Sequence, residues 1–389
     1  MKNKRKVLAV ILLFISWNSM QSQNVPAANG SDVRTVASFL AIAPDARAAG
    51  MGETGVATSP DVYSMHWNIA KLAFAEKKFG AGLSYTPWLH SIFPDVNLGY
   101  LSLYMKPDSV SAVAASVRYF SMGELTIVNG AGSGVAQYKP YEFAIDLGYT
   151  RRIAKYWSLG IAARFINSNL TNGINTGSQQ GKAIAIDLGI YHYGRDRIKI
   201  LSHPSVLTFG AALTNVGNKI KYVPSDPGEF IPINLRVGEG IQIDFAESQK
   251  ISFQLELNKL LVPTQPIYDT TSAGQPYIVA GKDPHVSVAT GMVQSFFDAP
   301  GGKKEEMHEI NFSFGAEYVY NNTFAFRTGY FYESPTKGSR QFITLGGGVK
   351  FRFVSLDLAY LVATNGKRNP MKDTMRFSLQ FQFDHFRNK

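Results

Sequence analysis

Apolar and polar side chains alternate along many segments of this chain. In 375–384 the odd-numbered positions are apolar, from Met375 to Phe383, and the even-numbered positions are polar, from Arg376 to Asp384. A soluble β-sandwich also alternates, but its exposed face mainly carries Lys, Glu and Thr. In this chain the polar face of the segments, for example 141–149 and 157–165, mixes Gly and Ala with single charges. A strand between lipid and a crowded lumen has this mixture. The pattern therefore predicts an all-β transmembrane protein, an antiparallel outer-membrane β-barrel.

About fourteen segments of this kind follow residue 78, and we expect each to be one barrel strand. They span 79–88, 95–106, 110–121, 140–151, 156–168, 181–193, 205–215, 232–244, 250–260, 307–319, 323–333, 340–353, 354–363 and 374–386. Even-numbered connections are short and most odd-numbered ones are long, as in barrels with short periplasmic turns and long extracellular loops. We therefore expect both termini to be periplasmic. Residues 285–297 would make an odd, fifteenth strand, so we assign them to the long loop 261–306.

The first residues have the pattern of a secretory signal peptide. Four cationic side chains between Lys2 and Lys6 precede the apolar run from Val7 to Trp17. This run is shorter than the ~20 residues of a spanning helix. We therefore expect residues 1–22 to be a signal peptide. The chain has no Cys, which excludes a lipid-anchored lipoprotein and a thiolate metal site.

Residues 23–78 do not alternate. They are rich in Ala and Gly, contain Pro44 and Pro60, and indicate short helical pieces and turns. A segment of this length is too long for a simple tail. We expect it to be an N-terminal plug inside the lumen, followed by the transmembrane β-barrel at 79–389.

The positive charge of the chain does not indicate a nucleic-acid partner. The whole chain carries +10, and removing the four charges of the signal peptide leaves 10 − 4 = +6. These charges are scattered among the predicted strands and turns, whereas nucleic-acid binding requires a clustered basic surface.

Two groups of residues resemble a known superfamily. Asp45-Ala-Arg-Ala-Ala-Gly-Met-Gly52, followed by Trp67-Asn68, resembles the Ala-Arg-x-x-Gly-Met-Gly and Trp/Tyr-Asn-Pro-Ala blocks of FadL-type outer-membrane barrels. Within that superfamily, the sequences at 294–302 and 329–338 are similar to the PorV family of the type IX secretion system. One departure is Ile69, which stands where the superfamily usually has Pro.

The resemblance implies a fourteen-stranded barrel with a plug in the cell outer membrane, and no enzymatic activity or cofactor. It also implies a role in protein transport. PorV-like proteins collect the C-terminal signal domains of secreted cargo at the type IX translocon and carry them to a sortase-like attachment complex. Their barrel is surrounded by outer-membrane lipid. A FadL-type transporter of small hydrophobic compounds is the second hypothesis, and an outer-membrane hydrolase is the third.

Two sets of residues are candidates for these roles. The plug residues that match the superfamily blocks are Asp45, Arg47, Gly50, Met51, Gly52, Trp67 and Asn68. The candidate cargo-docking loop contains Phe296, Phe297, Pro300, Gly301 and Gly302. Aromatic anchors dominate the energetics of protein interfaces, and a flexible Gly pair beside them suits docking. The alternative is that Phe296 and Phe297 pack this loop onto the barrel rim.

Other candidate sites in the sequence are weak. Gly50-Met-Gly-Glu-Thr-Gly55 fits the dinucleotide fingerprint, but no strand precedes it within a βαβ unit, so we expect these glycines to form tight turns. The seven His contain no His-x-x-x-His pair, and no catalytic set has a local signature. We therefore assign no catalytic, cofactor-binding or metal residues.

Ten charged residues occupy positions that the alternation places in the lumen: Arg118, Glu142, Asp146, Arg164, Asp187, Arg236, Glu256, Arg327, Asp357 and Arg376. Their mixed signs favour ion pairs that hold the plug or bridge strands, because an isolated buried charge is costly. A selectivity filter is the alternative.

Overall fold

The computed structural model describes residues 33–88, 93, 95–128, 134–170, 177–200, 202–271, 274–364 and 374–384. Its main element is a closed antiparallel barrel of fourteen strands, in which each strand pairs with its neighbours along the chain and β1 pairs with β18. The strands are β1 (Phe79–Pro87), β2 (Val96–Met105), β3 (Ser111–Met122), β6 (Tyr141–Ala154), β7 (Trp157–Asn169), β8 (Gly181–Ile200), β9 (His203–Gly217), β10 (Asn234–Ala246), β11 (Gln249–Leu260), β14 (Ile310–Tyr320), β15 (Phe324–Tyr332), β16 (Gln341–Phe351), β17 (Val354–Ala363) and β18 (Met375–Phe383). The fourteen-stranded barrel predicted from the alternation is therefore confirmed. The predicted signal peptide lies outside the described residues.

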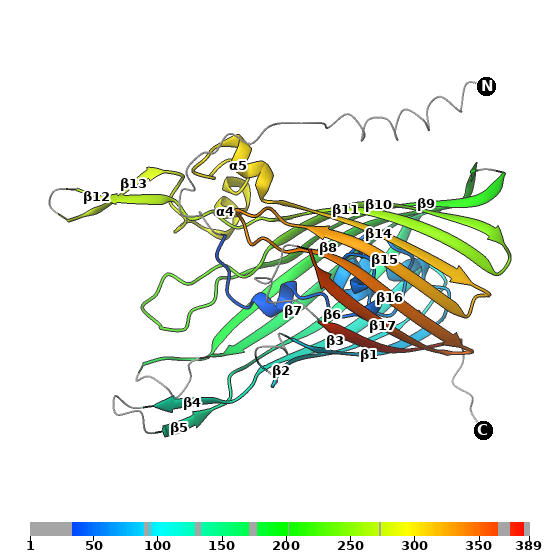
Figure 1. Cartoon of the computed structure of the whole chain (residues 1–389), viewed down its shortest axis with the longest axis horizontal. Coiled ribbons are helices and arrows are strands. Elements are labelled where there is room, and N and C mark those ends of the chain that lie inside the picture. The colour runs from blue at the N-terminus through cyan, green and yellow to red at the C-terminus, as the bar shows by residue number, and fades with distance from the viewer. Residues whose placement is uncertain are drawn as a thin grey trace. The chain divides into compact units, whose positions relative to one another are not determined.

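The long connections contain structure that the alternation did not predict. Two hairpins stand apart from the barrel sheet: β4 (Leu125–Val128) with β5 (Gly134–Tyr138), and β12 (Ile267–Thr270) with β13 (Pro276–Ala280). Two short helices, α4 (Val288–Gln294) and α5 (Lys303–His308), lie between β13 and β14. Residues 285–297 are thus no barrel strand, as expected. Figure 1 shows both hairpins and both helices at the same end of the barrel, here called the long-loop end.

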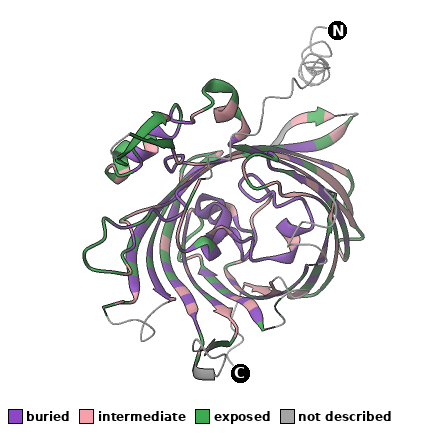
Figure 2. Cartoon of the chain, turned by 60° about the vertical axis from the view of Figure 1, so that its left-hand side comes forward, coloured by how far each residue is buried: buried purple, intermediate pink, exposed green. Residues whose placement is uncertain are grey.

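The barrel wall separates apolar from polar side chains as the alternation requires. Along β8 the outward Ile184, Ile186 and Leu188 are exposed, whereas the inward Ala185 and Asp187 are buried. Buried and exposed positions alternate along the other barrel strands too (Figure 2). This period of two brings one apolar face of each strand to the outside of the barrel.

Aromatic side chains gather at both ends of the outer wall. Towards the long-loop end Tyr119, Tyr141, Phe143 and Phe165 form a chain of ring contacts with centroids 5.9 to 6.5 Å apart. Towards the opposite end the ring of Trp157 contacts those of His192 and Phe209 at 4.8 and 6.3 Å. Aromatic girdles of this kind mark the two membrane interfaces of a barrel. Among the described residues no helix is long and apolar enough to cross a membrane.

Residues 37–75, here called the luminal segment, lie inside the ring of strands (Figure 2). The segment consists of turns and four short helices: η1 (Ser38–Ala41), α2 (Ala46–Ala49), α3 (Ser64–Trp67) and η2 (Ile69–Phe74). Nearly all of its side chains are buried against the inward face of the barrel. Some of its apolar residues form a cluster with the small inward residues Ala112, Ala114 and Ala162.

The luminal segment crosses the barrel from one end to the other. Val33 forms an isolated bridge with Thr264 at the long-loop end. At the opposite end the backbone oxygen of Lys78 accepts a hydrogen bond from the nitrogen of Lys106, directly before β1. Both termini lie outside the described residues, so the expectation that they are periplasmic stays a prediction, while the first described residue, Val33, lies at the long-loop end. The alternation carries no information about a segment that enters the lumen before the first strand.

The barrel predicts different costs for two substitutions of Leu379 on β18. Leu379 pairs with the outward, half-exposed Leu83 and Leu356 near the middle of the strand. We expect Leu379→Arg to destabilise the barrel by ~2–4 kcal/mol, because it puts a charge into lipid at mid-depth. Leu379→Met should cost less than ~1.5 kcal/mol, because it conserves apolar volume. The unfolding free energy of barrels refolded into lipid vesicles measures both, and equal costs would contradict this facing.

Labelling tests the same facing without a stability measurement. Gln382 lines a cavity in the lumen, whereas Phe377 is exposed on the outer wall. A membrane-impermeant maleimide applied to reconstituted Gln382→Cys protein should therefore label it, and Phe377→Cys protein should stay unlabelled. Equal labelling of the two variants would show that the wall does not separate lipid from lumen.

Candidate functional site

The turn at 50–55 is fitted against the backbone of the barrel wall. Gly52 has a φ of +66°, which favours glycine, and a Cβ on it would lie 2.6 to 2.7 Å from backbone atoms of Phe314 and Tyr330. A Cβ on Gly50 would lie 3.0 Å from the Cα of Gly346. The side chain of Met51 is fully buried next to this turn. The glycines of the superfamily block therefore allow close contact with the wall and, as expected, form a tight turn.

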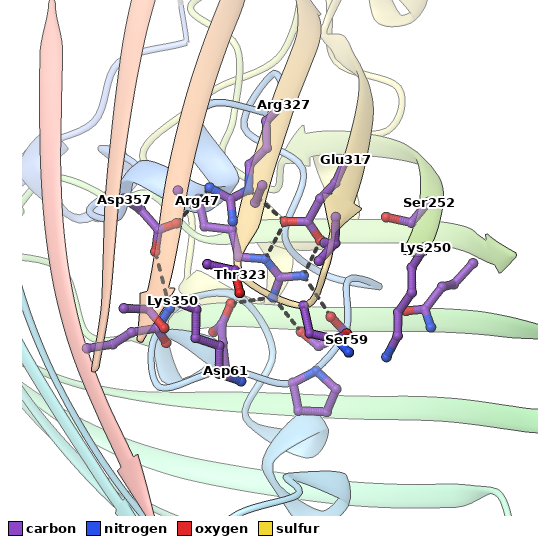
Figure 3. A pocket seen from close by; sticks show the side chains of 18 of the residues that line it. Arg47, Ser59, Asp61, Lys250, Ser252, Glu317, Thr323, Arg327, Lys350 and Asp357 are labelled. Carbon is purple, nitrogen blue, oxygen red and sulfur yellow. Dashed lines mark hydrogen bonds and ion pairs between the residues drawn. The ribbon is translucent and has the colours of Figure 1, made fainter. Parts of the chain in front are cut away.

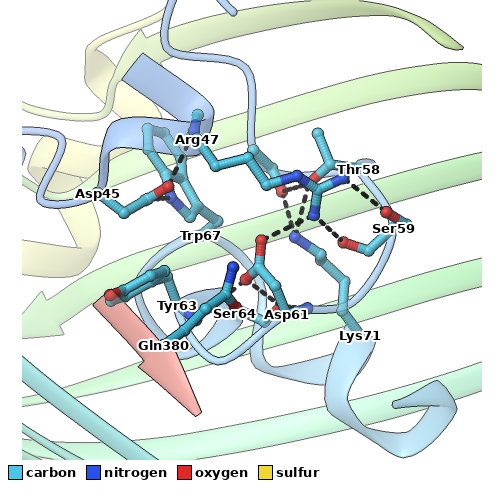
Figure 4. A network of polar contacts seen from close by, with 12 residues as sticks. Asp45, Arg47, Thr58, Ser59, Asp61, Tyr63, Ser64, Trp67, Lys71 and Gln380 are labelled. Atoms are coloured by element: carbon cyan, nitrogen blue, oxygen red, sulfur yellow. Dashed lines mark hydrogen bonds and ion pairs between the residues drawn. The ribbon is translucent and has the colours of Figure 1, made fainter. Parts of the chain in front are cut away.

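Asp45 and Trp67 connect two helices of the luminal segment (Figure 4). One carboxylate oxygen of Asp45 accepts from the backbone nitrogen of Ala48 at 2.8 Å and so caps helix α2. The other accepts from the indole nitrogen of Trp67 at 2.6 Å. The guanidinium of Arg236, on the barrel strand β10, lies 4.8 Å from the centroid of the Trp67 ring. These contacts fix α2, α3 and the wall together.

Asn68 and Ile69 show how this chain forms the turn at which the superfamily usually has Pro. The side-chain oxygen of Asn68 accepts from the nitrogen of Ala70 at 3.1 Å and caps η2. Its side-chain nitrogen donates to the backbone oxygen of Ile190 at 3.0 Å. Ile69 begins η2 and is buried against Gly148, on which a Cβ would clash with the Ile69 side chain. The apolar side chain of Ile69, which packs on the wall, thus takes the place of the proline ring.

Arg47 links the luminal segment to the barrel wall by its charge (Figure 3). Its guanidinium makes two hydrogen bonds to the carboxylate of Glu317 on β14, of 3.1 and 2.9 Å. It also donates to the carboxylate of Asp61, within the luminal segment, at 2.9 Å. Arg327 donates to Glu317 at 2.6 Å and to Asp357 at 2.7 Å, which extends the network across β15 and β17. Five charged groups are thus paired in one buried cluster.

All ten charges that the alternation places in the lumen are buried. Arg164 pairs with Asp146 and Asp187, Arg236 pairs with Glu256, and Arg376 pairs with Glu53. The prediction that mixed signs form ion pairs is confirmed for these residues. Glu317 and Glu53 were missed by the sequence analysis, although the alternation along β14 gives Glu317 an inward position.

Lys71 is a fully buried cation on η2. Its ammonium donates to the backbone oxygen of Gly55 and to the hydroxyl of Thr58, both at 2.8 Å. These two hydrogen bonds hold the turn at 55–58 against η2.

A cavity of about 470 Å³ lies between the luminal segment and the barrel wall, towards the end of the barrel with the short turns. Arg47, Asp61, Glu317, Lys250 and Gln382 are among its lining residues, and its walls are mainly polar (Figure 3). A polar space of this kind suits water rather than an apolar solute.

The candidate docking loop belongs to a folded unit, residues 282–309, here called the cap. Lys259 at the end of β11 and Lys337 after β15 both bind the carboxylate of Glu309, at 2.7 and 2.8 Å. The hydroxyl of Thr264 donates to the same carboxylate at 2.6 Å. These side chains are buried, so the cap is fixed to the barrel rim by ion pairs shielded from water.

Asp298 lies at the base of the cap and is buried. Its carboxylate accepts a hydrogen bond from the backbone nitrogen of Thr264 at 3.2 Å. Burial raises the pKa of Asp298 to about 6. The neighbouring carboxylates of Glu306 and Glu309 act in the same direction.

The two phenylalanines of the cap point into solvent, with 51% of Phe296 and 55% of Phe297 exposed. The ammonium of Lys282 lies 3.9 Å from the centroid of the Phe297 ring. Val293 and Met307 on the two helices are exposed as well. The cap thus presents apolar side chains on its surface, while its base holds the ion pairs.

The glycine pair beside these rings forms the start of a helix. The nitrogen of Gly301 donates to the carboxylate of Glu305 at 2.6 Å, and Gly302, with a φ of +69°, precedes α5. Pro300 packs close to Gly281. Glu305 thus binds the nitrogen of Gly301 in this turn, and the expected flexibility of the Gly pair stays a prediction.

Comparison with known proteins identifies the family. A model of the type IX secretion system protein PorV matches residues 25–267, more than half of the chain. The chain belongs to the PorV family. No curated protein sequence matches it. As a member of this family with a closed barrel, it is an outer-membrane component of the type IX secretion system.

Solved structures share the fold at low sequence identity. A mutant of the monoaromatic hydrocarbon channel TodX is 13% identical, with a TM-score of 0.51 over 88% of this chain and 99% of that one. The toluene transporter TodX of Pseudomonas putida is 12% identical, with a TM-score of 0.50 over 87% and 97% of the two chains. This similarity shows the barrel fold alone. Because a fold does not determine a function, the function has to be argued from the residues of this chain.

The buried Arg47 network predicts a large effect of one substitution. We expect Arg47→Met to destabilise the protein by ~3–5 kcal/mol, because Asp61 and Glu317 lose a buried partner. Lys77→Met removes an exposed pair with Asp384, whose side chains are 43% and 45% exposed, and should cost only ~0.2–1 kcal/mol. Equilibrium unfolding in detergent compares the two variants, and equal costs would show that the luminal network does not hold the segment.

Proposed function

We propose that the chain binds C-terminal signal domains of secreted cargo on its cap and carries them from the type IX translocon to a sortase-like attachment complex. The observation that carries this proposal is the exposed apolar surface of the cap, at the long-loop end, on a base fixed by buried ion pairs. Because the cap is already ordered, binding does not have to order it, and this favours affinity. Membership of the PorV family supports a partner within this secretion system.

We also propose that residues 23–78 act as a plug that closes the barrel. The contacts of the luminal segment support this role, since it binds the wall through Arg47, Asn68 and the turn at Gly52. A closed lumen leaves the outer surface for partners. In this reading the docking residues are Phe296 and Phe297, with Pro300, Gly301 and Gly302 shaping the turn that leads into α5.

A transporter of small hydrophobic compounds remains the alternative function, and its support is the fold shared with the toluene transporter TodX. Transport of this kind requires an apolar path. The cavity beneath the luminal segment instead carries ion pairs such as Arg47–Glu317 on its walls. This observation favours the shuttle.

The docking role predicts a loss of cargo binding when both rings are removed. We expect Phe296→Ala/Phe297→Ala protein to insert normally but to recover at least about tenfold less cargo in a pull-down from solubilised outer membranes. Truncating an aromatic hot spot costs ~2 kcal/mol or more, whereas these rings do not hold the barrel together. Mass spectrometry of the recovered C-terminal signal domains is the measurement.

The matched control removes two exposed aromatic residues at the opposite end of the barrel, Phe351→Ala/Phe353→Ala. It should recover normal amounts of cargo per inserted barrel. Equal recovery from the Phe296/Phe297 variant and the wild-type protein would exclude these rings as the docking site. Recovery of small apolar solutes without cargo would favour the transporter.

Replacing residues 288–304 with a short Gly-Ser link tests the cap as a whole. The barrel should still insert, because none of its strands lies in this segment and loop closure depends only weakly on length. Cargo export and capture should fall, and heat-modifiable migration in gels should report the folded barrel. Normal export by the inserted variant would contradict the proposed docking site.

A further inference from the structure

A polar hollow of about 770 Å³ lies at the rim of the barrel, beside the long-loop end of β8. It is formed by the residues just before β8, the first residues of that strand and the residues just after β9. Its lining residues are Ser178, Gln179, Gln180, Lys182, Asn218, Lys219 and Lys221. Three of the seven are lysines and none is acidic, so the hollow has a positive electrostatic potential.

The hollow borders directly on the lipid-facing wall. Lys182 occupies an outward position of β8, in line with Ile184, Ile186 and Leu188, and all four side chains are exposed. Lys182 is the member of this row nearest the long-loop end. A cation that continues an apolar stripe at the end of a spanning strand lies at the depth of the lipid headgroups.

Hydrogen bonds fix the backbone around the three lysines. The side chain of Asn218 accepts from the nitrogen of Ile184 at 2.8 Å and donates to the oxygen of Lys182 at 3.4 Å. The nitrogen of Gln179 donates to the oxygen of Tyr222 at 2.8 Å. The hollow is therefore built by two chain segments, 178–184 and 218–222, that are bound to each other.

Lys219 is held in place by an aromatic ring as well. Its ammonium lies 4.2 Å from the centroid of the Phe230 ring. The acidic groups that act on it are Glu229 and Asp283, and neither belongs to the lining. Lys182 and Lys221 add two further positive charges, so the hollow retains a net positive charge that favours an anion.

We propose that this hollow binds the phosphate groups of an anionic glycolipid in the outer leaflet of the outer membrane. The lipid-facing row below Lys182 contacts the acyl chains, and the three lysines contact the phosphorylated headgroup. Clustered Lys side chains next to a membrane-spanning segment attract anionic headgroups, and each additional cation strengthens the binding. This inference rests on the outer-membrane barrel and is independent of cargo binding on the cap.

The test is native mass spectrometry of the detergent-purified full chain, titrated with diphosphoryl lipid A. We expect the triple variant Lys182→Gln/Lys219→Gln/Lys221→Gln to bind at least about tenfold more weakly than the wild-type protein. Lipid A without phosphates should bind the wild-type protein as weakly as diphosphoryl lipid A binds the triple variant. Unchanged binding by the triple variant, or equal binding of the two lipids, would overturn the proposal.

The control variant Lys282→Gln/Lys303→Gln/Lys304→Gln removes the same charge from the long-loop end but leaves the hollow intact, and it should bind normally. Displacement of lipid A by inorganic phosphate at equal concentration would show a site for free anions and overturn the lipid assignment. If the triple variant fails to fold in the heat-modifiability assay, Lys182→Gln alone should weaken binding about two- to fivefold. No change in that single variant would contradict the proposal.

Discussion

The structure depends on one constraint, the pairing of charges that are buried inside the barrel. Arg47, Glu317 and Arg327 lie in the lumen with side chains no more than 12% exposed, where an unpaired charge is costly. Arg47 and Arg327 both bind the carboxylate of Glu317 on β14, and Arg327 also binds Asp357 on β17. The bond from Arg47 fixes the luminal segment to β14. The same rule governs the cap, where Lys259 and Lys337 share Glu309. Ion pairs thus position both the interior and the outer surface, while the strands provide the frame.

The strands determine the fold, whereas the surfaces positioned by the ion pairs carry what is specific to the function. TodX shares the barrel at 12% identity, so the barrel alone does not distinguish a channel from a secretion component. What is specific to this chain lies on the surfaces that the ion pairs hold in place. The rings of Phe296 and Phe297 face solvent on an ordered cap, and the proposed lipid site at Lys182 borders the wall. Both lie at the long-loop end, which the lengths of the connections predict to face the outside of the cell.

Much of this architecture was predictable from the sequence, because a wall between lipid and lumen imposes a period of two. That period gave the fourteen strands and the inward positions of residues such as Arg164 and Asp357. It carries no information about segments outside the wall. The path of the luminal segment depends on tertiary contacts between residues far apart in sequence, and the helices α4 and α5 lie in a long connection outside the barrel wall. The partner of Arg47 is one of these contacts, since Glu317 lies 270 residues away in sequence.

The most direct test of the account is site-specific photocrosslinking in cells that are exporting cargo. A photoreactive side chain at position 297 samples the cap surface, and one at position 382 samples the luminal cavity. We expect crosslinks from position 297 to C-terminal signal domains and none from position 382. Cargo crosslinked from the lumen, or its absence at position 297 during normal export, would contradict a closed barrel that binds its partners on the cap.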